Sequence, residues 1–266
     1  MFQHTLYRVT RSAGLQVLQR RGTGGARELT TWRLRLAPGE RAAYHSRDEE
    51  TVLVLLEGAG SMEAGGEHWG VGRRDVFSER ATAAYLPAGV ATTVTAQSPL
   101  EAILVSTPAA AAAASRPVLI GPDAVRVQPR GREGFRREVH DLFVDDPHAR
   151  RLMVGETFSP AGHWSSYPPH KHDGGDGEPK LEEVYYFRVD PPHGFGVQVL
   201  YAAGGEAVAH VVRDGDAVLL PSGYHPVAAA PGYRLYYLWA LAGEVRRLVV
   251  HEDPQHAWVH HAAGAP

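Results

Sequence analysis

The chain has 266 residues, with 27 Lys and Arg, 30 Asp and Glu, 15 His and no Cys, and a formal charge of −3 at pH 7. The near-neutral charge argues against a nucleic-acid partner, and the absence of Cys excludes disulfides and thiolate metal sites. No stretch approaches the roughly 20 apolar residues of a membrane span, and the first residues lack the basic start and apolar run of a signal peptide. We therefore expect a cytoplasmic protein with no membrane partner.

Short strands dominate the predicted secondary structure. The 29 Gly and 19 Pro supply frequent turns between apolar runs of strand-forming residues. The alanine-rich run at 109–115 lies between two prolines and is predicted to be a linker. This pattern predicts an all-β fold, either a sandwich or a barrel. In chain order, the predicted strands are 32–36, 51–56, 184–187, 197–201, 217–220 and 235–239.

The two halves of the chain repeat two landmarks. A Glu-Glu pair opens a predicted strand in each half, and Glu50 and Glu183 are 133 residues apart. A Pro-x-Gly motif follows in each half, with Pro87 and Pro221 134 residues apart. Two landmarks at nearly the same spacing predict a duplicated β-domain. We expect the domains to be 1–115 and 116–266, with the boundary within 108–129.

Candidate metal ligands gather in the second half. His170 and His172 have the i, i+2 spacing that places two side chains on one face of a strand, although solvated loop residues also show it. A carboxylate follows where Glu182 and Glu183 open a strand, and His225 comes after the Pro-x-Gly motif that ends another. Three His and one Glu form a mixed nitrogen and oxygen set that suits one divalent ion, such as Zn, Fe, Mn or Ni.

This pattern resembles the metal-binding motif of cupins, which are small β-barrels that hold an ion inside. Longer strings are similar to the 5-deoxy-glucuronate isomerases of inositol catabolism, relatives of the uronate isomerase of pectin breakdown. The resemblance implies a bicupin fold of two jelly-roll barrels. It also implies a metal-dependent aldose–ketose isomerase that converts 5-deoxy-glucuronate to 5-dehydro-2-deoxygluconate through an enediol. The strings are SSYPPHKHD at 165–173, LEEVYY at 181–186, DPPHGF at 190–195 and GYHPV at 223–227.

The resemblance also implies roles for single residues. Glu183 is preferred to Glu182 as the ligand because strand alternation then turns Tyr185 inward. The other register would turn Arg188 inward, where a buried guanidinium would need a partner. Glu182 is then a candidate catalytic base, and Tyr185 is a candidate donor to a sugar oxygen. The implied ligands of one divalent ion are His170, His172, Glu183 and His225.

A sugar acid also needs a cationic partner for its carboxylate, for which an arginine fork is suited. Arg188 and Arg234 follow the motif in the sequence, but the sequence alone places neither in a pocket.

The first half departs from the metal-binding motif. Ala91 stands where His225 stands in the second half, and His45-Ser46-Arg47 replaces the His-x-His string. An alanine cannot bind a metal and a guanidinium repels one, so we expect this half to be metal-free. Its expected role is packing and homo-oligomer formation.

Two other functions share the same ligand set. An iron-dependent dioxygenase can use three His and one Glu, and a non-catalytic sugar-binding bicupin could retain the residues without turnover. The isomerase is preferred because the strings that flank the ligands carry the family likeness. Its expected partner is a small-molecule sugar acid.

Overall fold

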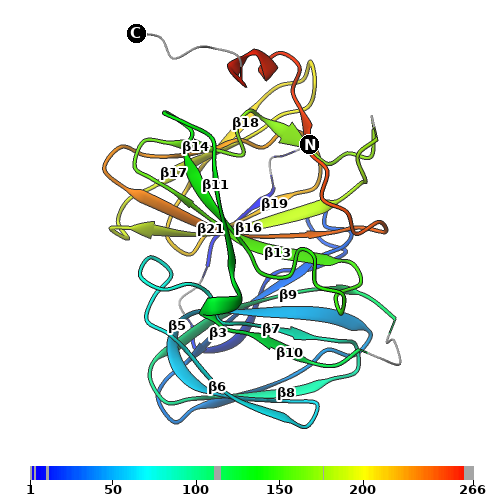
Figure 1. Cartoon of the computed structure of the whole chain (residues 1–266), viewed down its shortest axis with the longest axis vertical. Coiled ribbons are helices and arrows are strands. Elements are labelled where there is room, and N and C mark those ends of the chain that lie inside the picture. The colour runs from blue at the N-terminus through cyan, green and yellow to red at the C-terminus, as the bar shows by residue number, and fades with distance from the viewer. Residues whose placement is uncertain (1, 3, 10–11, 111–114, 176, 261–266) are drawn as a thin grey trace.

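The computed structural model describes residues 2, 4–9, 12–110, 115–175 and 177–260. The strands form two halves that lie one above the other in Figure 1. Two short 3₁₀ turns, η1 (Pro122–Ala124) and η2 (Ala257–His260), occur among the described residues. Every predicted strand overlaps an observed one. The predicted linker falls largely on residues 111–114, which lie outside the described part. Within the described ranges, no helix combines the length and apolar character needed to cross a membrane.

The half formed by earlier residues contains a 9-stranded sheet in which β5 joins two layers. The first part of β5 pairs with β7 and β9, and its second part pairs with β6 and β8. Gly58 lies at the passage between the layers with φ +98°, and a Cβ there would lie 2.2 Å from the Pro99 carbonyl oxygen. Only glycine fits such a position without strain. The strands are β2 (Gly14–Gln19), β3 (Thr30–Leu36), β4 (Arg41–His45), β5 (Glu49–Ala64), β6 (Glu67–Arg73), β7 (Ala83–Leu86), β8 (Ala91–Ala96), β9 (Leu100–Pro108) and β10 (Val118–Ile120).

The half formed by later residues contains a 7-stranded sheet of order β1-β19-β16-β21-β13-β12-β11 and a 4-stranded sheet of order β14-β20-β17-β18. A third, 2-stranded sheet pairs β15 with β22. The strands are β1 (Leu6–Tyr7), β11 (Arg126–Arg130), β12 (Arg137–Asp141), β13 (Leu152–Ser159), β14 (Trp164–Ser165), β15 (His170–Lys171), β16 (Glu182–Asp190), β17 (Gly196–Leu200), β18 (Val208–Val212), β19 (Ala217–Leu220), β20 (Val227–Ala229), β21 (Arg234–Ala242) and β22 (His251–Glu252).

The two halves exchange edge strands. Near the N-terminus, β1 pairs with β19 of the later half, and Figure 1 shows this end of the chain beside that half. In the opposite direction, β10 follows the predicted linker in the sequence but pairs with β7 of the earlier half. Each large sheet therefore contains one edge strand from a part of the chain that lies next in sequence to the other sheet.

Strand alternation divides the apolar side chains between the inside of each half and the junction of the two halves. Along β16, Val184 and Tyr186 belong to the core at the junction, whereas Tyr185 and Phe187 belong to the core inside the later half. The earlier half repeats this arrangement along β5, with its own inner core. Because successive side chains of a strand point to opposite faces, a shift of one residue decides whether a group reaches the inside or the junction.

The all-β prediction is confirmed by this architecture. The sheets are open paths of strands rather than closed cylinders, so the barrel part of the prediction is not confirmed.

Candidate metal centre

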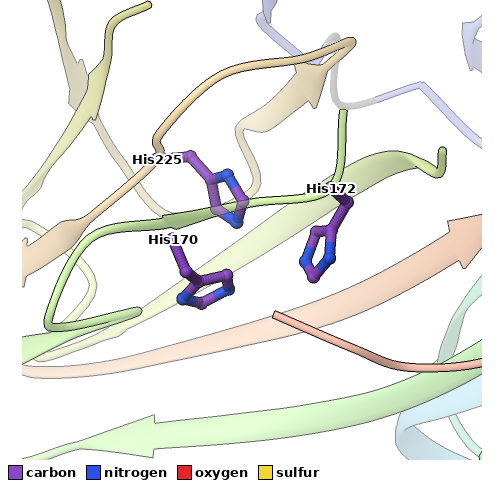
Figure 2. A group of neighbouring side chains, drawn as sticks. All are labelled: His170, His172 and His225. Carbon is purple, nitrogen blue, oxygen red and sulfur yellow. The ribbon is translucent and has the colours of Figure 1, made fainter. Parts of the chain in front are cut away.

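Three imidazoles converge inside the later half. His170 and His172 come from the segment that contains β15, and His225 comes from the loop between β19 and β20. Figure 2 shows the three rings turned toward one shared space, and one ring nitrogen from each lies within 4.8 Å of the others. Such spacing allows three nitrogens to bind one ion.

Glu183 supplies a carboxylate to the same space from β16. Its Oε2 lies 3.2 Å from Nε2 of His225 and 3.8 Å from Nε2 of His172. The side chains of Glu183, His172 and His225 are buried. The structure therefore brings the four predicted ligands together.

The unused atoms of this cluster fit a bound cation. His172 donates from Nδ1 to the Val249 carbonyl at 3.0 Å, and His225 donates from Nδ1 to the Gly223 carbonyl at 2.9 Å. These bonds select the tautomer in which Nε2 carries a lone pair directed at the cluster. Among the described residues, Nε2 of His225 and Oε2 of Glu183 are buried without a hydrogen-bond partner. Buried polar atoms of this kind are rare in proteins, and a metal ion would satisfy them.

The electrostatics of the cluster favour neutral imidazoles at two positions. Burial, together with the neighbouring imidazoles, holds the pKa of His170 well below its usual value. Burial also lowers the pKa of His172, against the opposing effect of Glu183. Burial also acts to lower the pKa of His225, but the contact with the Glu183 carboxylate outweighs burial and raises this pKa. A neutral imidazole is the form that binds a metal.

Tyr185 lies beside the cluster, one inward position beyond Glu183. Its ring stands edge-on to His225 at 6.0 Å and packs against Tyr237 at 4.4 Å between centroids. Its hydroxyl lies 2.8 Å from Oγ of Ser166. Burial and the nearby Glu183 carboxylate raise the pKa of Tyr185 well above its usual value, so the hydroxyl keeps its proton.

A cavity of 1010 Å³ opens onto these residues. Hydroxyl groups of Tyr185, Tyr237 and Ser166 line it beside His170, and Trp239 contributes an apolar wall. The combination of apolar walls and a few convergent polar groups is typical of a small-molecule site.

Glu182 does not reach this cavity, which corrects the prediction that it is a catalytic base. Alternation along β16 directs it to the junction of the halves, where its carboxylate accepts hydrogen bonds from three consecutive backbone N–H groups. The distances are 2.6 Å from Arg27, 3.1 Å from Glu28 and 2.9 Å from Leu29. Because a catalytic base must reach the substrate proton, this location leaves Glu182 a structural role.

The earlier half contains the counterpart of this contact. Glu50 accepts hydrogen bonds from the backbone N–H groups of three consecutive residues, at 2.8 Å, 2.6 Å and 2.7 Å. Its partners are Arg150, Arg151 and Leu152.

The strand registers extend the equivalence. Thr51 faces Leu86 across the sheet as Glu183 faces Leu220, each directly before the Pro-x-Gly motif. Glu50 is thus equivalent to Glu182, and the ligand position of the earlier half holds Thr51. Our alignment of Glu50 with Glu183 was therefore wrong by one residue.

The absence of a metal from the earlier half stays a prediction. The one group of three potential ligands among the described residues is His170, His172 and His225. His45 is exposed, and its Nδ1 accepts a hydrogen bond from the Arg47 backbone. The interior of this half is instead packed with apolar side chains, including Leu34, Leu53 and Met62.

The two arginines considered for the substrate carboxylate lie elsewhere. Arg188 points to the junction, where Asp214 lies at 2.9 Å and Glu101 at 3.6 Å, so it has the partners that the sequence did not reveal. Arg234 pairs with Asp190 outside the cavity. The cavity is instead lined by Arg137 of β12, which sequence reasoning missed. The period-two pattern of Arg137, Val139 and Asp141 could have indicated a strand with an arginine on its inner face.

Comparisons with known proteins identify similar chains. A model of the KduI/IolB family matches residues 10–259. A protein of Geobacillus kaustophilus named 5-deoxy-glucuronate isomerase is 41% identical over 230 residues, which cover 84% of this chain and 83% of that protein. The Bacillus subtilis (strain 168) protein of the same name is 34% identical over 235 residues, or 85% of each chain.

Solved structures give the same result. The crystal structure of an IolB-like protein from Salmonella typhimurium LT2 is similar with a TM-score of 0.89 and 33% identity, covering 96% of this chain and 99% of that one. Oxalate decarboxylase of Lactobacillus farciminis shares the fold with a TM-score of 0.68 and 12% identity, over 99% of this chain and 92% of that one.

Proposed function

The chain belongs to the KduI/IolB family and is an isomerase, and we propose that it converts the aldose 5-deoxy-glucuronate to the ketose 5-dehydro-2-deoxygluconate. The observation that carries this proposal is the convergence of His170, His172, His225 and Glu183 beside a cavity large enough for a six-carbon sugar acid.

We propose that these four residues hold one divalent ion, with Zn, Mn, Fe and Ni as the candidates. The buried atoms without hydrogen-bond partners and the mixed nitrogen and oxygen donor set support this assignment. A bound divalent ion would supply Lewis-acid polarisation of the sugar carbonyl and stabilise the negative charge that develops on its oxygen.

Isomerisation moves a proton between the two carbons at the carbonyl end of the sugar, by way of an enediol. Tyr185 is suited to donate a hydrogen bond to a sugar oxygen during this step, since its hydroxyl keeps its proton and lines the cavity. Ser166 fixes the direction of that hydroxyl through their 2.8 Å contact. A group held in place before the reaction needs no reorganisation when charge develops.

The apolar part of the cavity contributes in a second way. Trp239, Met153 and Leu241 form walls beside the polar groups. Such walls exclude water, and the electrostatic interactions between the polar side chains and the substrate are stronger as a result.

We further propose that each half is a cupin-type domain, divided as the sequence predicts. The support is the matching contacts of Glu50 and Glu182, together with the fold shared with oxalate decarboxylase. The metal-free half would then serve packing, and the homo-oligomer stays a prediction.

The proposed reaction is tested by incubating purified protein with 5-deoxy-glucuronate without oxygen and following the sugar by NMR. We expect the aldehyde signal to decline and the ketose signals to appear at the same rate with and without oxygen. Turnover that requires oxygen would indicate the dioxygenase, and no turnover under either condition would contradict the isomerase proposal.

A further inference from the structure

Most arginines that line the cavity already have partners. Arg126 pairs with Asp141 and Asp145, at 2.5 Å and 2.9 Å. Arg246 donates to the carbonyl oxygens of Leu152 and Phe143, at 2.7 Å and 2.9 Å. These guanidinium groups are used in holding the wall of the cavity together.

Arg137 differs from the exposed Arg130 and Arg247 in being half-buried, and from the half-buried Arg246 in donating one hydrogen bond instead of two. That bond runs from Nη1 to the carbonyl oxygen of Phe135, at 3.1 Å. No carboxylate of the described residues lies within the 4 Å of an ion pair with it. By contrast, Arg33 at the junction of the halves is buried and is paired with Glu101 at 2.8 Å.

The position of Arg137 directs it at the proposed reaction site. Arg137, Val139 and Asp141 alternate along β12, and all three line the cavity. Arg137 lines the same cavity as His170, Glu183 and Tyr185, which places it on the wall of the proposed reaction site.

Arg137 and the histidine cluster reach the cavity from different strands. Strand β12 is separated from β16 by β13 and β21, and a substrate that lies in the cavity between them can contact both.

An enclosed guanidinium without a carboxylate partner is a site prepared for an anion. Burial lowers the pKa of Arg137, against the opposing effect of Glu252, but an arginine stays charged at neutral pH. A cation removed from water favours an anionic partner, and the planar fork of a guanidinium matches a carboxylate through two parallel hydrogen bonds.

We propose that Arg137 binds the carboxylate of the substrate, with the carbonyl end of the sugar directed at His170, His172 and His225. This assignment rests on the proposed isomerase function and adds to it the residue that makes the enzyme select an acid sugar over a neutral one. Arg137 is a substrate-binding residue in this account and takes no part in moving the proton.

The test compares two sugars and four proteins. The sugars are 5-deoxy-glucuronate and 5-deoxy-glucose, in which a hydroxymethyl group replaces the carboxylate. The proteins are the wild type, Arg137→Met, Arg137→Lys and the control Arg234→Met, which removes an arginine outside the cavity. The kinetic constants kcat and KM are measured for each pair, together with metal content and the circular dichroism spectrum.

We expect wild-type kcat/KM to favour the acid by about 100-fold, the effect of losing charged hydrogen bonds. Arg137→Met should remove most of this preference, mainly by raising KM for the acid, and leave the neutral sugar within about threefold. Arg137→Lys should give an intermediate preference because it keeps the charge without the fork. Arg234→Met should match the wild type, and metal content should be the same throughout.

Two results would overturn the assignment. One is a wild-type protein that converts both sugars with equal kcat/KM. This result can be obtained even if the methionine variant fails to fold. The other is an acid preference that persists in Arg137→Lys and Arg137→Met. Wild-type protein that converts neither sugar would instead contradict the proposed function, and the Arg137 assignment with it.

Discussion

Replacing Glu182 with glutamine tests whether the two adjacent glutamates of β16 have separate roles. Glu182 is 5% exposed, and its carboxylate accepts hydrogen bonds from three backbone N–H groups across the junction. A glutamine has one oxygen acceptor, which can retain the bonds from Glu28 and Leu29. The N–H of Arg27 would then face an NH₂ group and lose its acceptor.

The magnitude follows from these bonds. An unsatisfied buried N–H costs about 1–3 kcal/mol, and the two remaining bonds weaken from charged to neutral by about 0.5–1 kcal/mol each. Burial raises the pKa of Glu182, which means that removing its charge recovers part of this loss. We expect the free energy of unfolding to fall by about 2 kcal/mol, with metal content unchanged.

The matched variant is Glu183→Gln on the neighbouring residue. It should lower metal content strongly, while the free energy of unfolding of the metal-free protein changes by less than about 1 kcal/mol. Urea unfolding in a chelator gives the stability, and elemental analysis gives the metal content. If Glu182→Gln removed the metal, or left the stability unchanged, the assigned strand register would be wrong.

Three further predictions concern other residues of the two halves. His225→Ala should lose the metal and the activity and keep the circular dichroism spectrum of the wild type; unchanged metal stoichiometry would refute its assignment as a ligand. Glu50→Gln should destabilise the protein by about 2 kcal/mol in urea unfolding, since Glu50 also caps three N–H groups, and a loss of metal would contradict its equivalence to Glu182. Tyr185→Phe should lower kcat by about 100-fold at constant metal content, and an unaltered kcat would leave Tyr185 a packing residue.

Local patterns were sufficient to predict the strands, whereas the ligand set came from the resemblance to known isomerases and stays a prediction. The runs at 184–187 and 217–220 combine apolar and strand-forming residues between turn residues, and both are strands. The alternation of Glu183 with Tyr185 depends only on the period of a strand, and both side chains line the cavity. The resemblance to 5-deoxy-glucuronate isomerases is confirmed by the comparisons with known proteins.

Long-range pairing was beyond these patterns. A Glu-Glu pair occurs in each half, and an offset of 133 residues aligns Glu50 with Glu183. The hydrogen bonds of these pairs to the opposite half are needed to show that Glu50 matches Glu182. The partners of Arg188 are Asp214 and Glu101 of the other half. Both are far from Arg188 in the sequence, so the sequence does not indicate that they lie beside it. Arg137 was missed because its role depends on the absence of a carboxylate partner among the described residues, which no strand pattern shows.

We propose that three imidazoles and one carboxylate create the activity by holding a cation. The direct measurement is turnover of 5-deoxy-glucuronate as a function of bound metal, in protein stripped by a chelator and reloaded with increasing amounts of a divalent ion. We expect no activity in stripped protein and a linear rise in activity that ends at one ion per chain. Full activity in protein shown to contain no metal would contradict it.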